Sequence, residues 1–545
     1  MKQKSITSRT EHLMNLLGLK YRDNKRCLVV CIVGALMIIS GVMIMHYQPI
    51  KAFVTSQMKM SPNSLLFKLF QHPPIEVTLG IYVFNVTNAE QFLAGKEKLK
   101  LEEVGPYVYI EDIKNTNPIF HDNGTLSFTT KRFLEFRRDL SVGDPLKDTI
   151  ISPNIPLLGI SSFLKDKSMM TNLIVAQIAN IMNSQQFLNL TIDQYLWGYD
   201  DNLVTLAHNA LPNWINFPRF GIFDRLLALD NASNTVTIKI TDDPIESSLL
   251  SDLESRAPYS IVNFNGSPGL HHWGYHDQPR NETSEYNSRC NSIEGAYESG
   301  VFDARFINES TDIWFYRRAF CRAVPIQYSG RGRYENFDTV NARIRSNFLS
   351  LPEQNPQNEC YCKQPGVNCR YNGVGYLAPC YYGIPITISQ PHFYNADAAL
   401  LEQVEGMHPD RTKHDTHLAI SETIGVPVHA RMRIQINLDV DTRMSSRCKP
   451  FNGIMLPLFW IELGTYQLSW IFYAADYGIK YVVPIFSGLL SWLLIIFGAA
   501  IAASAALLTF YSQPHPGFED LYDNKVGYTP IRVIPVYTNP TIRIS

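Results

Sequence analysis

Seven cysteines in the second half of the chain are the residues best suited to chemistry, because thiols bind metal ions or pair as disulfides. They are Cys290, Cys321, Cys360, Cys362, Cys369, Cys380 and Cys448. Four of them lie within residues 360–380, and four thiolates would suit a tetrahedral zinc ion. The Cys-x-Cys spacing is tighter than in usual zinc knuckles, so the cluster favours disulfides over metal. Spacing alone does not choose among the many connectivities, but Cys448 lies far from the cluster and is the natural odd thiol.

Two histidine groups could also hold a metal ion or act as a general base. They are His271, His272 and His276 in HHWGYH, and His408, His414 and His417 in HPDRTKHDTH. Neither group has ligand spacing on a recognisable scaffold, and histidines beside Trp and Tyr are more often packing or surface residues. The sequence therefore predicts no metal and no cofactor.

The common motifs of catalysis give no support for an enzyme. The Gly373-x-Gly375-x-x-Ala378 run matches a dinucleotide fingerprint only as a string, because it lies between two cysteines of the cluster and not at a strand-to-helix turn. The sequence contains no G-x-S-x-G elbow, no H-E-x-x-H helix and no P-loop. We therefore expect a binding protein and not an enzyme.

Charge and composition narrow the class of protein further. The chain carries 48 Lys and Arg against 50 Asp and Glu, a formal net charge of −2, which argues against a nucleic-acid binder and against an acidic disordered chain. Its 45% hydrophobic content supplies enough apolar side chains for a large packed core. The apolar residues are concentrated near the two chain ends, so membrane insertion must be considered.

Two apolar runs without charged side chains, 27–45 and 481–510, are each long enough to cross a membrane. About 20 apolar residues in a helix span a hydrocarbon core of roughly 30 Å. The first run exceeds the apolar block of a signal peptide, and the basic residues before it favour a cytoplasmic N-terminus. The predicted membrane hairpin has a cytoplasmic N-tail (1–26), a first span (27–46), an extracellular or lumenal domain (47–480), a second span (481–511) and a cytoplasmic C-tail (512–545).

Cysteines and glycosylation acceptors agree with this topology. The seven cysteines above lie in the outside domain, where an oxidising compartment would let them pair. The Asn-x-Ser/Thr acceptors lie in the same domain, at Asn85, Asn123, Asn189, Asn231, Asn265, Asn281 and Asn308. We therefore expect a glycosylated, disulfide-bonded ectodomain.

The spans carry two further motifs. Cys27 and Cys31 at the cytoplasmic end of the first span are candidates for S-palmitoylation, with inert membrane cysteines as the alternative. Gly498, Ala502 and Ala506 form a stripe of small residues in the second span, which could pair two copies into a homo-oligomer or could reflect only tolerance of Ala.

Hydrophobic periodicity predicts an ectodomain that is one large α+β unit. Period-2 alternation predicts antiparallel strands at 76–87, 107–113, 126–136, 235–240, 313–320 and 429–440. Helices are predicted at 88–99, where Asn88 and Gln91 resemble a capping box, and at 395–406. The longest helical stretch is predicted at 157–198, and it is unusually apolar.

Several segments resemble the class B scavenger receptor family of fatty-acid translocase, lysosomal integral membrane protein and insect sensory neuron membrane protein. The segments are YVFNVTNAEQFLAGKEKLKLEEVGPYVY (82–109), LWGYDDNL (196–203), the cysteine array, PCYYGIPITISQPHFYNAD (379–397) and LFWIELG (458–464). The resemblance implies an antiparallel β-barrel with an internal apolar tunnel and an apical helical bundle. It also implies three disulfides, Cys290 to Cys360, Cys321 to Cys380 and Cys362 to Cys369, which leaves Cys448 over.

The resemblance further implies that residues of 157–198 form an apex that captures ligand or partner. Candidate apical residues recur at roughly helical spacing, namely Phe163, Leu164, Met169, Met170, Leu173, Ile174 and Ile178. They could pack inward as the core of a bundle or stay exposed as a docking surface. The chain departs from the fatty-acid translocase at 182–186, where no cation stands at the place of that protein's apical lysine.

These observations predict an integral membrane scavenger-type receptor. It would bind fatty acids, sterols, carotenoids or lipoprotein lipids and pass them to the bilayer through the tunnel, at the plasma membrane or in endosomes and lysosomes. The alternative is a trafficking receptor that carries a protein at its apex. Tyr528-Thr-Pro-Ile531 favours the alternative, because it fits a Tyr-x-x-bulky endocytic or lysosomal sorting signal.

Overall fold

The computed structural model divides the chain into two compact units, one made of the two chain ends up to Phe53 and from Tyr481, and the other of Val54–Lys480. It describes residues 24–511 except 214, 231–233, 246–248, 278–284, 299–300, 304–305, 308, 310–311, 365–366 and 443–446. Most of the predicted N-tail, all of the C-tail with Tyr528 and Ile531, and the acceptors Asn231, Asn281 and Asn308 lie outside the described residues.

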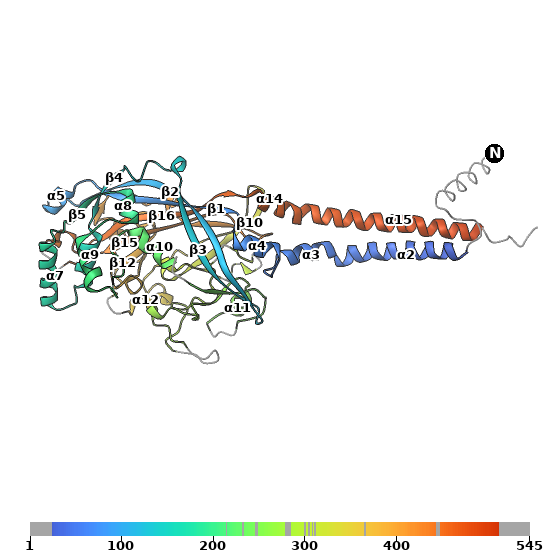
Figure 1. Cartoon of the computed structure of the whole chain (residues 1–545), viewed down its shortest axis with the longest axis horizontal. Helices are drawn as coiled ribbons and strands as arrows, with labels where there is room; N and C mark the ends of the chain where they lie inside the picture. The colour runs from blue at the N-terminus through green and yellow to red at the C-terminus, as the bar shows by residue number, and fades with distance from the viewer. Residues whose placement is uncertain are drawn as a thin grey trace, which may run out of the picture. The chain divides into compact units, whose positions relative to one another are not determined.

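The unit of the chain ends contains two long apolar helices that run side by side, α2 (Asn24–Tyr47) and α15 (Val483–Tyr511) (Figure 1). Both are long and apolar enough to cross a membrane, which fits the predicted two-span topology. A short helix, α14 (Trp470–Tyr477), precedes α15 and is joined to it by a π-helical segment, Gly478–Val482.

Small residues let α2 and α15 approach closely. A Cβ atom added at Gly34 would lie 2.7 Å from the carbonyl oxygen of Gly498 and 3.1 Å from the Cβ of Ala502. Gly498 and Ala502 of the predicted stripe therefore face α2 of the same chain, and a second copy could reach these two residues only by displacing α2, whereas Ala506 is exposed. Cys31 belongs to the same interface, where its thiol lies 4.0 Å from the carbonyl oxygen of Ala502, whereas Cys27 is half-buried near the start of α2.

The ectodomain is built on one large antiparallel sheet whose strands follow the order β7-β6-β3-β2-β1-β16-β15-β14-β10-β9-β8. These strands are β1 (Ile75–Val86), β2 (Leu99–His121), β3 (Thr125–Phe136), β6 (Val236–Lys239), β7 (Ile261–Phe264), β8 (Asp312–Tyr316), β9 (Ala323–Tyr334), β10 (Phe337–Ile344), β14 (His417–Ser421), β15 (Pro427–Asp439) and β16 (Met455–Leu468). Alternate residues of β1, among them Leu79, Ile81 and Val83, are buried in the main core, as period-2 patterning requires.

Shorter strands complete the sheet structure. β11 (Val374–Tyr376) pairs with β12 (Ile386–Ser389), which pairs with β15, and β13 (Val404–Glu405) runs parallel to β2. A separate two-stranded sheet is formed by β4 (Thr149–Pro153) and β5 (Phe187–Thr191).

One short segment links the two end strands of the large sheet. Ile261 of β7 donates its backbone N–H to Ala296 at 2.6 Å, and Tyr297 donates to Trp314 of β8 at 2.7 Å. Tyr316 of β8 donates back to Tyr297 at 2.9 Å. The α+β fold class with a large antiparallel sheet is confirmed, and residues 295–297 connect β7 with β8.

The predicted strands are confirmed better than the predicted helices. Five of the predicted segments lie in β1, β2, β3, β6 and β15. The sixth, 313–320, is a strand only as far as Tyr316, because a 3₁₀ turn (Arg318–Phe320) follows and Cys321 adopts a left-handed backbone conformation. Period-2 alternation could not reveal β16 or β14, since long stretches of these strands are buried on both faces. β10, which has exposed residues at Asp338 and Arg343, was missed as well.

The helix predicted at 88–99 is wrong beyond its first turn. Only α5 (Ala89–Leu93) forms, and Gly95, at φ +68°, ends it. The Asn88 side chain does not cap the helix, because its side-chain oxygen accepts a hydrogen bond from the backbone N–H of Lys100 at 2.9 Å instead. The prediction at 395–406 is also wrong, since only a 3₁₀ turn (Ala398–Leu400) precedes β13.

The single helical stretch predicted at 157–198 is instead several elements. They are α6 (Ile155–Phe163), α7 (Met169–Ile181), β5 and α8 (Ile192–Trp197). Ser168 and Thr191 accept backbone hydrogen bonds as N-caps of α7 and α8, so each side chain starts a new helix. Asn183 has φ +52° after α7, and pairing with β4 then extends the chain into β5.

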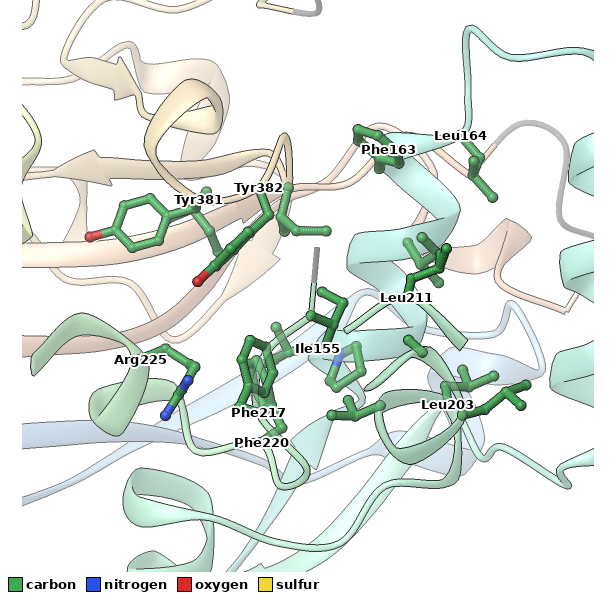
Figure 2. A pocket seen from close by; sticks show the side chains of 18 of the residues that line it. Ile155, Phe163, Leu164, Leu203, Leu211, Phe217, Phe220, Arg225, Tyr381 and Tyr382 are labelled. Carbon is green, nitrogen blue, oxygen red and sulfur yellow. The ribbon is translucent and has the colours of Figure 1, made fainter. Parts of the chain in front are cut away.

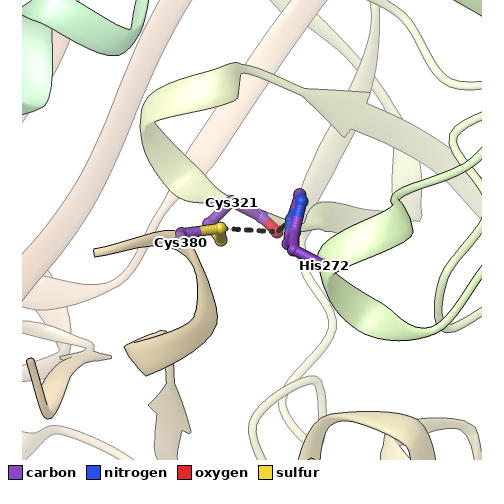
Figure 3. A group of neighbouring side chains, drawn as sticks. All are labelled: His272, Cys321 and Cys380. Carbon is purple, nitrogen blue, oxygen red and sulfur yellow. Dashed lines mark hydrogen bonds between the residues drawn. A yellow bond between two sulfur atoms is a disulfide. The ribbon is translucent and has the colours of Figure 1, made fainter. Parts of the chain in front are cut away.

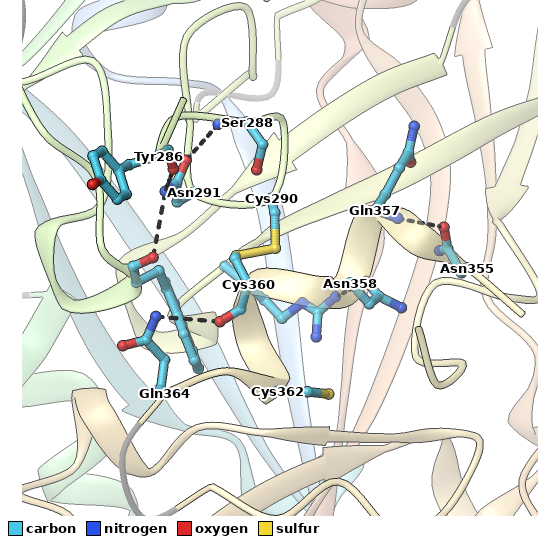
Figure 4. Close-up of a disulfide and its surroundings, with 12 residues drawn as sticks. Tyr286, Ser288, Cys290, Asn291, Asn355, Gln357, Asn358, Cys360, Cys362 and Gln364 are labelled. Carbon is cyan, nitrogen blue, oxygen red and sulfur yellow. Dashed lines mark hydrogen bonds between the residues drawn. A yellow bond between two sulfur atoms is a disulfide. The ribbon is translucent and has the colours of Figure 1, made fainter. Parts of the chain in front are cut away.

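Three disulfides join Cys290 to Cys360, Cys321 to Cys380 and Cys362 to Cys369, the same pairs that the resemblance implies. Figure 4 shows Cys290 and Cys360 joining a loop to the short helix α12 (Glu359–Cys362). Cys448 lies outside these pairs and is fully buried.

We expect the disulfides to differ in their contribution to stability. Cys290 and Cys360 are 70 residues apart, whereas Cys362 and Cys369 are 7 apart. If chain entropy dominates, replacing both cysteines of a pair by Ser should cost about 4 kcal/mol for the first bridge and about 2 kcal/mol for the second. Denaturant unfolding of the two double variants beside the wild-type protein would measure this. Equal losses would contradict the entropic explanation.

Candidate functional site

Four helices of the ectodomain, α6, α7, α9 (Asn202–Ala210) and α10 (Ile222–Asp230), contribute residues to the wall of a cavity, and Figure 2 shows side chains that line it. Side-chain caps fix where the first three helices begin. Asn154 accepts a hydrogen bond from the backbone of Leu157 at 3.0 Å to start α6, and Asp201 accepts one from Leu203 at 2.9 Å to start α9. These caps set the register that turns the apolar faces of the helices toward the cavity.

The cavity has a volume of about 440 Å³ and is lined almost wholly by apolar side chains. From the helices and their connections these include Ile155, Ile160, Phe163, Leu164, Ile178, Leu203, Ala207, Leu211, Phe217, Phe220, Ile222 and Leu226, and from the sheet side Tyr381, Tyr382, Ile386 and Ile436. A volume of this size is typical of small-molecule sites in proteins.

Two polar groups of the lining, those of Arg225 and Tyr381, are occupied by neighbouring protein groups. The guanidinium of Arg225 lies 4.3 Å from the ring centre of Phe217 and pairs with Asp224. The hydroxyl of Tyr381 donates to the carbonyl of Ala319 at 2.6 Å. The cavity therefore presents a predominantly apolar surface, which suits the hydrocarbon part of a ligand.

The predicted apical residues separate into two sets. Phe163, Leu164 and Ile178 line the cavity. The others, Met169, Met170, Leu173 and Ile174, lie on the outer face of α7 with side chains 47–66% exposed. The buried side of α7 is made by residues such as Asn172 and Ala179. Sequence reasoning missed the cavity residues of α9 and α10, although the capping Asp201 in LWGYDDNL marks where α9 begins.

A second, smaller cavity of about 130 Å³ is lined by residues of β1, β2 and β3, among them Val77, Ile113 and Thr130. Its apolar wall includes Leu66 and Phe70 of α4 (Leu65–Gln71) and Phe472 of α14. Its polar part includes Asn115 and Thr130 as well as Arg132 and Glu298, whose charged groups lie 2.7 Å apart. Glu111 lies 2.6 Å from Arg317 and 3.5 Å from Arg132, which completes a buried network of two cations and two carboxylates.

The two cavities share no lining residue within the described part of the chain. Val77 of β1 lines the small cavity. The large cavity is lined by Ile436 of β15, which is opposite Phe459 of β16, and Phe459 is in turn opposite Val83 of β1. Six residues of strand separate these levels by roughly 20 Å. Along this direction the described residues line two separate apolar cavities, and the tunnel that the resemblance implies stays a prediction.

Aromatic side chains fill the interval between the cavities. Phe459, Phe223, Trp197 and Tyr109 form a chain of ring contacts with centroid distances of 5.5–6.3 Å. The indole N–H of Trp197 donates to the hydroxyl of Tyr109 at 3.1 Å. These rings connect the large cavity to the level of Leu79, which is in register with Tyr109.

The first histidine group is divided between the surface and a disulfide. His271 and His276 are exposed, whereas His272 lies beside Cys321 and Cys380 (Figure 3). The two sulfur atoms are bonded to each other and so are not thiolate ligands. Burial lowers the pKa of His272 to about 4, so its imidazole is neutral near pH 7.

The second histidine group does not converge either. His408 and His417 are exposed, whereas His414 is buried and stacks on His392 with 4.5 Å between ring centres. His392 Nε2 lies 2.6 Å from a carboxylate oxygen of Glu103. His414 Nδ1 accepts a hydrogen bond from the backbone N–H of Asp410 at 2.9 Å, and burial lowers the pKa of His414 to about 4.

The described glycosylation acceptors differ in exposure. Asn123, Asn189 and Asn265 are exposed, and a glycan at these positions would extend into solvent. Asn85 is half-buried in β1, and its side-chain oxygen accepts a hydrogen bond from the backbone of Ile151 at 2.9 Å. A glycan on Asn85 would be attached to the side-chain nitrogen, while the side-chain oxygen holds this hydrogen bond.

Comparison with known proteins decides the family. A model of the CD36 family matches residues 32–509. The chain belongs to the CD36 family. It is 29% identical over 434 residues to scavenger receptor class B member 1 of Bos taurus, covering 79% of each chain. It is 31% identical over 380 residues to lysosome membrane protein 2 of Homo sapiens, covering 69% of this chain and 71% of that protein. The resemblance to class B scavenger receptors is thereby confirmed for this CD36-family member.

We expect the stability of this CD36-family ectodomain to fall as the pH is lowered from about 6.5 to about 4. The ordinary pKa of an unfolded histidine is about 6.5, whereas that of His414 in the fold is about 4. Within this window the unfolded chain binds a proton that the folded protein excludes, so acid favours unfolding. His414→Asn should reduce the fall, and His408→Asn, at an exposed position, should not. Unfolding midpoints across the window would check this, and equal slopes in all three proteins would contradict it.

Proposed function

We propose that the protein is an integral membrane receptor that takes up hydrophobic ligands and passes them toward the bilayer. The ligands would bind in the large cavity lined by α6, α7, α9 and α10, which we call the apical cavity. The observation that carries the proposal is the cavity of about 440 Å³ with its apolar lining. A ligand such as a fatty acid, sterol, carotenoid or lipoprotein lipid would gain about 0.8 kcal/mol for each buried CH₂ group. The membership in the CD36 family and the similarity to a scavenger receptor support the same function.

Transfer along the ectodomain would require the aromatic chain to move. A ligand leaving the large cavity meets Phe223 and Phe459 first, and then Trp197 and Tyr109. Rotamer changes of these rings would join the large cavity to the small one beside α14, which leads directly into α15. Both tails would be cytoplasmic, at the plasma membrane or in endosomal and lysosomal membranes.

Filling the apical cavity should reduce lipid binding without unfolding the protein. Ala207 lines the cavity, so Ala207→Phe would occupy space that a ligand needs. We expect the amount of lipid that co-purifies with the full chain, measured by mass spectrometry, to fall several-fold at a nearly unchanged unfolding temperature.

Thr205→Phe is the matched control, because Thr205 is exposed on the same helix and does not line the cavity. Both variants should fold, since neither side chain enters the packed core. Unchanged lipid in a stable Ala207→Phe variant would place the ligand elsewhere and reject the cavity as the binding site.

A second candidate function is a trafficking receptor that carries a protein at the apex. The exposed face of α7 favours it, because Met169 and Met170 are each 66% exposed beside Leu173 and Ile174. A contiguous apolar patch on a protein surface is typical of a docking site. The similarity to a lysosome membrane protein also supports this candidate, as does the predicted sorting signal at Tyr528 and Ile531.

Substitution of Met169 and Met170 by Ser separates docking from packing. Since both side chains are exposed, we expect the unfolding temperature to change little. Capture of lipoprotein particles or of a protein partner should weaken if this face docks it. Intact capture by a stable double variant would exclude this face. If the double variant no longer captures particles but still contains the normal amount of lipid, α7 would be the docking surface and the cavity would be the lipid-binding site.

A further inference from the structure

A polar groove of about 500 Å³ lies on β9, β10, β14 and β15, lined by residues distinct from those of both cavities. Strand pairing brings its side chains together. Arg343 of β10 is directly opposite His417 of β14. Residues opposite each other on antiparallel strands project from the same face, so these two side chains are neighbours in the groove.

Small residues form the floor of the groove. Ala419 of β14 lies in register between Asn341 of β10 and His429 of β15, so a methyl group stands between two larger side chains. Across β10, Gly330 is opposite Asn341 and has no side chain to fill the space. The rim is formed by larger groups, among them Arg333, Tyr334, Arg343, Arg411, His417 and His429.

The rim carries more positive than negative charge. Three arginines line the groove, and Asp415 is the single carboxylate among the described lining residues, 4.0 Å from Arg411. Among the described residues, neither Arg333 nor Arg343 forms an ion pair within 4.0 Å, but Asp338, opposite Arg333 in register, interacts electrostatically with Arg333. Arg343 is thus the arginine of the groove whose charge has no nearby carboxylate among the described residues.

Acidic residues near the groove are committed to other cations. Glu462 lies 2.7 Å from Arg433, and Glu422 lies 3.3 Å from Arg331. Asp338, which is in register with Arg333, lies 2.8 Å from Lys480. These pairs leave the excess positive charge of the groove in place.

Two imidazoles complete the groove. His417 Nε2 lies 3.0 Å from His429 Nε2, and the ring of His429 stacks on Tyr334 with 4.6 Å between centres. Two imidazoles this close could in principle bind a metal ion, but the surrounding arginines would repel a cation. An anion gains from the same surroundings, because arginine and imidazole both donate hydrogen bonds to oxyanions.

We propose that this groove binds a tetrahedral oxyanion of the phosphate type, held by Arg343 and Arg411 with His417 at its edge. The planar guanidinium presents paired N–H donors that match two phosphate oxygens. The anion would replace the missing counter-charge of Arg343 and lie over the floor made by Ala419.

Two sources could supply this chemistry, a phospholipid headgroup or free phosphate. The start of β10 is tied to the last residues before α15 through the ion pair of Asp338 with Lys480. Headgroups of the membrane that holds the chain are one source, and phosphate in solution is the other. The site chemistry is the same for both.

The test uses the full chain in nanodiscs of neutral lipid, titrated with inorganic phosphate in one arm and with a water-soluble short-chain phosphatidic acid in the other. Calorimetry would measure the dissociation constants. We expect Arg343→Gln and Arg411→Gln each to weaken binding about tenfold or more, because each removes a charge-assisted contact. Arg331→Gln is the matched control, since Arg331 lies on β9 outside the groove and pairs with Glu422.

Binding in either arm that depends on Arg343 and Arg411 but not on Arg331 supports the site. Binding of both probes with mutual competition assigns them to one groove. Tighter binding of the short-chain lipid points to a headgroup, and equal or tighter binding of phosphate points to the free anion. Absence of binding in both arms, or equal loss in the Arg331→Gln variant, would overturn the proposal. The lipid that co-purifies with each arginine variant would also be measured by mass spectrometry. An unchanged amount of lipid would show that loss of anion binding is independent of the proposed receptor function.

Discussion

The pairing of β1 with β16 is the constraint on which the rest of the ectodomain depends. These strands come from opposite ends of the sequence, and their register runs from Ile75 opposite Leu468 to Val83 opposite Phe459. The ladder brings the segment that follows α2 beside the segment that leads into α15. A chain with apolar helices at both ends can then enclose a single folded domain between them. β2 and β15 add to this central pair, so the core forms around it.

The disulfides stabilise the part of the domain where the sheet is least regular. The segment that links β7 with β8 begins only a few residues after Cys290, which is tied to α12. Trp273 packs edge-on against Tyr361 with 4.7 Å between ring centres, and its indole N–H donates to the carbonyl of Cys321 at 2.6 Å. Aromatic packing and covalent links thus act where few strand hydrogen bonds are available.

The interior of this domain contains both a buried network of charged side chains and an apolar cavity. Glu111, Arg132, Glu298 and Arg317 are nearly inaccessible, and each charge has an opposite charge nearby. Removing one member of such a network leaves an uncompensated buried charge, which costs several kcal/mol. The apical cavity has the opposite character, because its lining offers almost no polar atom to a ligand. The domain therefore combines a fixed polar interior near α14 with an adaptable apolar space near α7.

The two apolar spans and most of the long amphipathic strands could be predicted from the amino-acid sequence, because these signals depend on composition and on alternation between near neighbours. The sequence also showed the family resemblance, which named the disulfide pairs that spacing left open. Tertiary structure decided the cavity, since Phe163, Leu211, Tyr382 and Ile436 meet there from distant parts of the chain. It decided that Met169 and Leu173 face outward on α7, and that 157–198 breaks into helices and a strand, because strand pairing with β4 overrides helix propensity. The oxyanion groove has no local sequence signal, since Arg343 and His417 become neighbours only through the register of β10 with β14.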